Sequence, residues 1–310
     1  MEVIKSKDFK NIDMGPLVLA VGTFDGVHIG HQEVIKKAVD IAKEKNLPVG
    51  VYTFNPHPLK VLKPAIAPRS IISSRQKIEL LSNMGLNYYL EQKFSNSFAE
   101  MEYKDFVKDF LIGKFRVVHL VVGEDFHLGK NGKGDVQSLS KYGVKHGFKV
   151  TGLENITRDD ERISSTRIRE LIKKGKVDQI SDYLGRKYRL DGTVIKGMGR
   201  GHKFGIPTAN LKLDTDYQIP QKGVYACYVY YKNKQYCGIV NLGYNPTFAN
   251  NRFSIEVHIL NFDKDDIYGE WLSVELIERI RDEMTFDSTE ELVARIKKDI
   301  LYTESLLCYN

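Results

Sequence analysis

The sequence predicts an α/β chain in two parts: a parallel sheet flanked by helices, then a small antiparallel barrel that ends in a helix. In the first half, short apolar runs alternate with helical patterns, which is the order of βαβ units in a parallel sheet. From Tyr188 onward, strand-like runs are separated by Gly, Asn and Pro, which is typical of a compact antiparallel barrel. We place the boundary so that two domains cover residues 1–185 and 186–310.

Apolar periodicity gives the elements of the first half. We predict strands over residues 17–21, 49–54, 117–122 and 148–151. A helix after the first strand should end at Asn46, and two more are predicted over 74–84 and 98–111, which should stop at Gly85 and Gly113. Because ligands on parallel sheets bind beyond the carboxyl ends of the strands, the loops after the first three predicted strands matter most.

The second half should hold strands over residues 224–231, 236–240 and 253–260. The last helix is indicated by Ser288 and Glu291, which have the spacing of a capping box. Its apolar face is predicted from Leu292, Val293, Ile296 and Ile300.

Composition points to a globular protein that handles anions. Of the 310 residues, 42% are hydrophobic and 28% charged, and no apolar run approaches the length of a membrane helix. The net charge of +6 suits anionic small molecules such as nucleotides and leaves nucleic acid as an alternative. Since the N-terminus lacks the apolar core of a secretion signal, we expect a cytoplasmic protein. Cys227 and Cys237 could face each other on neighbouring strands, but free thiols are expected in a reducing compartment.

The most informative stretch is GTFDGVHIGH at 22–31, between the first strand and its helix. At such a turn, unpaired backbone N–H groups and the helix dipole favour an anion. Its glycines allow close approach, and its histidines can add donors. Alternatively, the histidines only cap the helix or form half of a metal site. The candidates here are Gly22, Phe24, Asp25, Gly26, His28, Gly30 and His31.

A second basic stretch, ISSTRIR at 163–169, enters another predicted helix. Ser164, Ser165 and Thr166 can cap that helix, and Arg167 or Arg169 can form a fork around an oxyanion. Taken alone, the three hydroxyl residues would be read as a cap.

Two loops beyond predicted strands carry further candidates. Asn55 and His57 lie in a loop made rigid by two prolines. His57 could be a simple turn residue, but its place beyond a strand end favours a binding role. Asp125 follows the third strand in a glycine-bounded loop, where a binding role and a turn role are about equally supported.

The second half begins with a glycine-rich stretch at 192–211. Its glycines, with Arg200 and Lys203, can wrap phosphates, although a glycine-rich hairpin would look the same. Thr208 and Asn210 are spaced to share one face of a strand, and their hard oxygens suit Mg²⁺. The candidates for binding ATP in this stretch are Gly197, Gly199, Lys203, Gly205 and Pro207.

Glu256 lies in the alternating run SIEVHI, which places it and His258 on one face, opposite three apolar residues. Such a pair is often the solvent face of an edge strand.

These motifs resemble known families. The turn at 22–31 and the ISSTRIR stretch are similar to the HxGH and ISSTxIR signatures of the nucleotidyltransferase superfamily, and PTAN at 207–210 is similar to the most specific motif of riboflavin kinases. GIVNLG at 238–243, NPTF at 245–248, EVH at 256–258 and RDE at 281–283 follow in the order of that family. Nearly the whole chain resembles the prokaryotic bifunctional riboflavin kinase/FMN adenylyltransferases, also called FAD synthetases. His202 and the loop at 124–129 depart from the usual pattern, which affects fine substrate contacts.

The resemblance implies a Rossmann-like nucleotidyltransferase domain and a riboflavin kinase barrel. The barrel would phosphorylate riboflavin to FMN, and the first domain would join FMN to ATP to give FAD and pyrophosphate. It implies that Glu256 is the base of the kinase and that His28, His31 and Arg167 stabilise charge in the adenylyltransferase. Mg²⁺ would bind at Thr208 and Asn210, with a second ion in the first domain. The implied flavin contacts are Asn55, His57, Asn241, Arg281 and Glu283.

Two other functions remain alternatives. One is an adenylyltransferase for another small phosphorylated substrate. The other is a nucleic-acid-binding protein that uses the basic balance and the tyrosines of the barrel. A complete kinase-like half argues against the first alternative, and the even spread of charge argues against the second.

Overall fold

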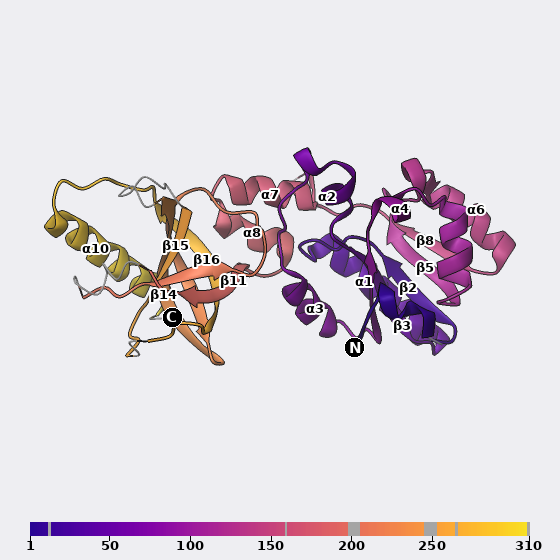
Figure 1. Cartoon of the computed structure of the whole chain (residues 1–310), viewed down its shortest axis with the longest axis horizontal. Helices are drawn as coiled ribbons and strands as arrows, with labels where there is room; N and C mark the ends of the chain where they lie inside the picture. The colour runs from indigo at the N-terminus through magenta and orange to yellow at the C-terminus, as the bar shows by residue number, and fades with distance from the viewer. Residues whose placement is uncertain (12–13, 159, 198–204, 245–252, 264–265, 309–310) are drawn as a thin grey trace. The chain divides into compact units, whose positions relative to one another are not determined.

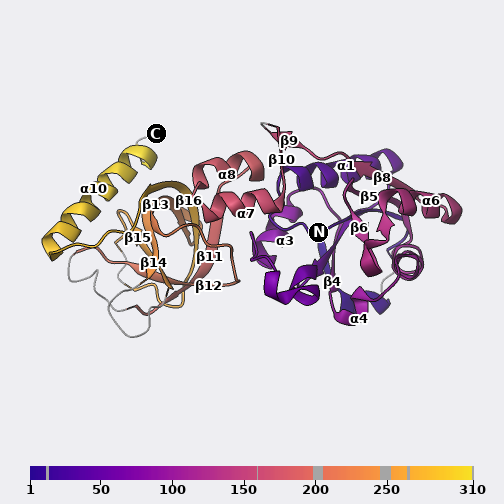
Figure 2. The same cartoon turned by 90° about the horizontal axis from the view of Figure 1, so that it is seen from above.

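The chain folds around two large sheets, of which one is parallel and the other closes into a barrel (Figures 1 and 2). The computed structural model describes residues 1–310 apart from 12–13, 159, 198–204, 245–252, 264–265 and 309–310. Two compact units result: the first holds Met1–Pro68 and Ser74–Ser165, and the second holds Arg69–Ser73 and Thr166–Asn310. The domain boundary between residues 185 and 186 stays a prediction.

The parallel sheet of the first unit has the strand order β1-β4-β3-β2-β5-β8. Its strands are β1 (Glu2–Lys5), β2 (Leu17–Val21), β3 (Val49–Asn55), β4 (Tyr88–Lys93), β5 (Val117–Gly123) and β8 (Lys149–Leu153). All four predicted strands are confirmed, whereas β1 and β4 escaped prediction. Two-residue ribbons pair β6 (His127–Leu128) with β7 (Gly134–Asp135), and β9 (Thr157–Arg158) with β10 (Glu161–Arg162).

The central strands of this sheet are buried on both faces because helices cover them. Every residue of β2 is buried, and Leu17, Leu19 and Val21 pack in one cluster with Phe106 and Leu111. The helix α1 contacts β2 as well, and strand alternation assigns it to the opposite face. The described α-helices of this unit are α1 (Ile29–Lys45), α2 (Pro58–Leu62), α3 (Ser74–Ser82), α4 (Asn96–Ala99), α5 (Tyr103–Phe106) and α6 (Val136–His146). The helix α1 ends at Asn46, as predicted, and this residue has a left-handed conformation.

The single helix predicted over 98–111 is wrong. The segment is divided into α4, α5 and a π-helical turn over Val107–Ile112. The carbonyl of Met101 accepts from the N–H of Lys130 at 2.8 Å, so a distant loop takes the acceptor that a continuous helix would use. Tertiary contact therefore overrides an apolar spacing that is helical by itself.

The second unit contains a closed antiparallel barrel in the order β11-β12-β15-β14-β13-β16. Its strands are β11 (Tyr188–Ile195), β12 (Ala209–Leu213), β13 (Gly223–Tyr231), β14 (Lys234–Tyr244), β15 (Phe253–Ile259) and β16 (Trp271–Arg281). The predicted barrel strands are confirmed. The second unit also contains α8 (Val177–Leu184) and α10 (Thr289–Leu307). It contains all of α7 (Ser165–Lys173) except the first residue, which belongs to the first unit. Among the described residues, no helix is both long and apolar enough to span a membrane.

A short segment from the first half of the sequence belongs to the second unit. Residues Arg69–Ser73 run beside the loop before β13, where Ser70 pairs with Tyr217 in parallel. The N–H of Ser70 donates to Asp216 at 3.0 Å, and the carbonyl of Ser70 accepts from Gln218 at 2.7 Å. Ile71 is fully buried in this arrangement.

Two cysteines are joined, contrary to the expectation of free thiols. Cys237 on β14 is bonded to Cys308 at the end of α10, with their Cα atoms 6.4 Å apart, and Cys227 is a buried free thiol. Cys227 lies opposite Gly238 in the ladder rather than opposite Cys237. The pairing partner of Cys237 comes from a helix 71 residues away in sequence, which strand spacing alone does not indicate.

The helix α10 begins at the predicted cap, where Ser288 accepts from the N–H of Glu291 at 3.2 Å. Its inner face carries a charge. Asp299 is only 1% exposed and binds Arg281 of β16 at 2.8 Å and Arg295 at 3.1 Å. A buried carboxylate is stable only while its cationic partners are present.

Replacing Asp299 with asparagine should therefore destabilise the barrel unit. We expect the free energy of unfolding to fall by about 3 kcal/mol, because both arginines lose their buried anion. Urea unfolding followed through Trp271, the one tryptophan, measures this. The control is Glu270→Gln, which removes a more exposed partner of Lys232 and should change stability by at most about 1 kcal/mol. Equal effects of the two variants would contradict the prediction.

Candidate active sites

The predicted anion turn connects β2 to α1, and the two histidines start the helix. His28 is the N-cap, and its Nδ1 accepts from the N–H of His31 at 3.3 Å. This bond places the proton of a neutral His28 on Nε2. The capping role that we considered as an alternative is therefore real.

The rings of the two histidines stack, with centroids 3.6 Å apart, and the Phe24 ring meets His31 edge-on at 5.4 Å. Nδ1 of His31 is buried and lacks a hydrogen-bond partner among the described residues. Burial, then His28, then Lys77 lower the pKa of His31 well below its usual value. In the free protein, His31 is thus a neutral side chain with a buried ring nitrogen that no described protein group satisfies.

Close contacts and backbone conformation explain why glycine occupies three positions of the turn. A Cβ at Gly22 would lie 3.1 Å from the Phe24 ring, and one at Gly30 would lie 3.2 Å from the His28 ring. Gly26 has φ +88°, in the left-handed region. Asp25 is buried within the same turn. The sequence candidates between 22 and 31 thus lie on one tight turn.

The ISSTRIR stretch contributes a contact to this turn. Oγ of Ser165 donates to the carbonyl of Asp25 at 2.8 Å. Ser164 is half-buried, whereas Thr166 is exposed. Arg167 lies on α7 at 3.4 Å from Glu170 and belongs to the second unit. Its predicted role toward phosphate stays a prediction.

Of the loop candidates in the first unit, His57 and Asp125 have structural partners. His57 caps α2, where its Nδ1 accepts from the N–H of Leu59 at 3.2 Å, and Asn55 is exposed at the end of β3. Asp125 accepts from Arg162 on β10 at 2.5 Å. Their roles toward flavin and ATP stay predictions.

In the barrel, strand register aligns three polar candidates. Glu256 on β15 lies opposite Asn210 of β12 on one side and opposite Asn241 of β14 on the other. Paired residues of an antiparallel ladder point to the same face. Ile255 and Val257 are buried, and Glu256 is half-buried, so the predicted alternation is confirmed. An amide–carboxylate–amide row therefore crosses three strands.

The PTAN stretch is fixed next to this row. Nδ1 of His258 lies 2.7 Å from the carbonyl of Pro207, and desolvation lowers the pKa of His258. The amide of Asn210 lies against Gly197, where a Cβ would overlap it. Thr208 is half-buried and Gly205 has φ +70°. Gly199 and Lys203 fall outside the described residues, as do Arg200, His202 and the NPTF stretch.

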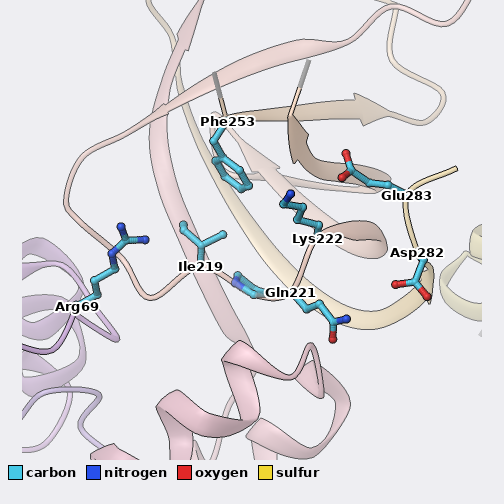
Figure 3. A pocket seen from close by; sticks show the side chains of 8 residues that line it. Arg69, Ile219, Gln221, Lys222, Phe253, Asp282 and Glu283 are labelled. Carbon is cyan, nitrogen blue, oxygen red and sulfur yellow. The ribbon is translucent and has the colours of Figure 1, made fainter. Parts of the chain in front are cut away.

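A cavity of about 760 Å³ opens beside the barrel, and Phe253, Lys222 and Glu283 point into it (Figure 3). Glu283 lies over Gly243, where any side chain would collide with its carboxylate. Arg281, another predicted flavin contact, is bound by Asp299 and does not line this cavity, so its role toward flavin stays a prediction. The remaining lining residues are Arg69, Ile219, Pro220, Gln221 and Asp282.

Comparisons with known proteins match both halves. The FAD synthetase family model covers residues 11–167, and the riboflavin kinase family model covers 184–307. The chain belongs to the bifunctional riboflavin kinase/FMN adenylyltransferase family. The relative from Listeria monocytogenes is 38% identical over 91% of this chain and 90% of its own. The relative from Bacillus subtilis is 39% identical with the same coverage, 91% and 90%.

The family membership confirms the predicted pair of enzymatic halves and their order. A crystal structure from Streptococcus pneumoniae, named as a macrolide-efflux protein, has the same fold over nearly the whole chain. Its TM-score is 0.87 at 32% identity, covering 97% of this chain and 98% of that chain.

Several residues at these sites escaped sequence reasoning. Thr53 and Lys77 bind the carbonyl of Thr23 within the anion turn, and Asp299 binds Arg281. A lysine on a short helix carries no sequence signal for such a contact. Asp299 does carry a sequence signal, because it interrupts the apolar stripe of α10 between Ile296 and Ile300.

Proposed function

We propose that the barrel half transfers the γ-phosphoryl group of ATP to the 5′-hydroxyl of riboflavin, and that the sheet half transfers the adenylyl group of a second ATP to FMN. The products are FMN and ADP in the first reaction, FAD and pyrophosphate in the second. The observation that carries the proposal is the presence of two chemically different sites, a carboxylate row in the barrel and a histidine turn in the first unit.

In the kinase reaction, Glu256 accepts the proton of the riboflavin hydroxyl as its oxygen attacks phosphorus. A positioned base accelerates such a step by about 10²–10⁴. Ser254 donates to the carboxylate of Glu256 at 3.3 Å, and Asn210 and Asn241 flank it in register, so its orientation is restricted. Glu283 and Phe253, in the adjacent cavity, are proposed to contact the flavin.

A magnesium ion fits Thr208 and Asn210. Their oxygens are hard and neutral, and the Asn210 amide is packed against Gly197. When bound, Mg²⁺ neutralises charge on the transferring phosphates. Two neutral ligands hold Mg²⁺ weakly, so we propose that these residues receive the metal together with the nucleotide. The second ion, in the first unit, stays a prediction.

The adenylyl transfer needs donors rather than a base, because the FMN phosphate is already anionic. His28, His31 and the backbone N–H groups at the start of α1 are suited to stabilise charge on the α-phosphate of ATP. Gly22, Gly26 and Gly30 keep that surface open. We place the protein in the cytoplasm, where ATP is available.

A time course with riboflavin, ATP and Mg²⁺ tests the whole proposal. FMN should appear first and FAD later, with ADP and then pyrophosphate as the second products. Adding EDTA should stop both steps. Turnover of nicotinate mononucleotide or phosphopantetheine in place of flavin would contradict the proposal, and so would a salt-dependent RNA complex without flavin turnover.

A further inference from the structure

The carbonyl of Thr23, in the anion turn, accepts hydrogen bonds from two side chains. Nζ of Lys77, on α3, donates to it at 2.7 Å, and Oγ1 of Thr53, on β3, donates at 3.0 Å. Thr53 is fully buried. Two separate elements therefore fix the direction of one peptide group at the end of β2.

Fixing this carbonyl also fixes the next N–H. In a trans peptide the C=O and N–H groups point in opposite directions, so the N–H of Phe24 points away from Lys77 and Thr53. Within the part of the chain that the structure describes, the N–H of Phe24 has no acceptor. Phe24 itself is buried, and buried N–H groups without partners are rare in folded proteins. An anion bound at the turn would satisfy this donor.

The backbone of the turn needs such support. Phe24 has φ +48° and Val27 has φ +41°, a conformation that L-residues other than Asn and Asp seldom adopt. Residues held this way persist only where their surroundings determine them, and they gather at functional sites. Lys77, Thr53 and Ser165 supply that determination through the carbonyls of Thr23 and Asp25.

Lys77 also brings positive charge to the turn. Desolvation lowers the pKa of Lys77, while the nearby carboxylates of Asp25 and Glu91 raise it. Asp25 and Glu91 are themselves buried, so the ammonium is balanced inside the protein. The same charge contributes to the lowered pKa of His31.

We propose that Lys77 is a positioning residue for adenylyl transfer, which holds the Thr23 carbonyl so that the Phe24 N–H is presented to a phosphate of ATP. The inference rests on the proposed function of the first unit. It assigns a role to a residue outside both motifs of that half.

The test compares Lys77→Met with Lys77→Arg in the full chain, and assays FAD formation from supplied FMN and ATP. Lys77→Met should lower kcat about 100-fold, the loss typical of a misplaced oxyanion donor, with a smaller change in the KM for ATP. Lys77→Arg keeps a charged donor and should recover at least a tenth of wild-type kcat. Lys36→Met removes an exposed lysine of α1 and is the matched control.

Riboflavin phosphorylation in the same protein is an internal reference and should stay unchanged. The proposal is overturned if Lys77→Met keeps kcat within threefold of wild type, or if the arginine variant is as impaired as the methionine variant. It is also overturned if Lys77→Met lowers both activities equally, since the residue then only supports folding. Failure of the proposed function itself gives a different result, because His31→Ala would then make FAD normally.

Discussion

Replacing His31 with alanine should stop FAD formation and let FMN accumulate from riboflavin and ATP. Among the residues that the structure describes, none is a hydrogen-bond partner of the buried Nδ1 of His31, which lies on the turn where α1 begins. A phosphate bound at the turn would be the acceptor, and removal of one such donor lowers kcat by about 10²–10³. Separation of FMN and FAD by chromatography over time measures the effect.

The barrel provides the reference for this variant, because riboflavin phosphorylation should continue at its normal rate. His146→Ala, which removes an exposed histidine of α6, is the control within the same unit. FAD output equal to wild type from the His31 variant would remove this residue from the reaction. Loss of both activities would show that the variant is misfolded or that the two sites are not separate.

Replacing Glu256 with glutamine should have the opposite outcome. Riboflavin phosphorylation should fall by about 10²–10⁴, because an amide cannot accept the proton of the hydroxyl. Glutamine has the same shape and can still accept from Ser254, so the row across β12, β15 and β14 should persist. FAD formation from supplied FMN should be unchanged.

Glu270→Gln, a glutamate of the same unit outside the row, is the control and should keep both activities. If Glu256→Gln phosphorylates riboflavin at the wild-type rate, Glu256 is not the base. If it also loses FAD formation from supplied FMN, the division of labour between the two halves is wrong.

Local patterns made much of the architecture predictable. The turn at 22–31 could be placed between β2 and α1 because Gly, His and apolar residues within one short stretch define it. Glu256 could be placed on a polar face because alternation is a property of the strand itself. Its flanking by Asn210 and Asn241, in contrast, depends on the register of three strands that are distant in sequence.

What escaped prediction depends on tertiary position. The break near Met101 depends on the N–H of Lys130, and the contact of Lys77 with Thr23 depends on where α3 packs. The bond between Cys237 and Cys308 depends on the path of α10. None of these partners lies within a window over which periodicity is read.

The strand-like segment Arg69–Ser73 limits how this enzyme can be taken apart. Its backbone completes hydrogen bonds of Asp216 and Gln218, and its buried Ile71 belongs to the second unit. A kinase fragment that starts at residue 166 or 186 lacks this segment and exposes an unpaired backbone edge beside Tyr217. The two activities are thus encoded in sequence order, but the second unit also uses a segment that lies within the first half of the sequence. A chimera that takes its two halves from different homologues must therefore take residues 69–73 from the same homologue as the barrel.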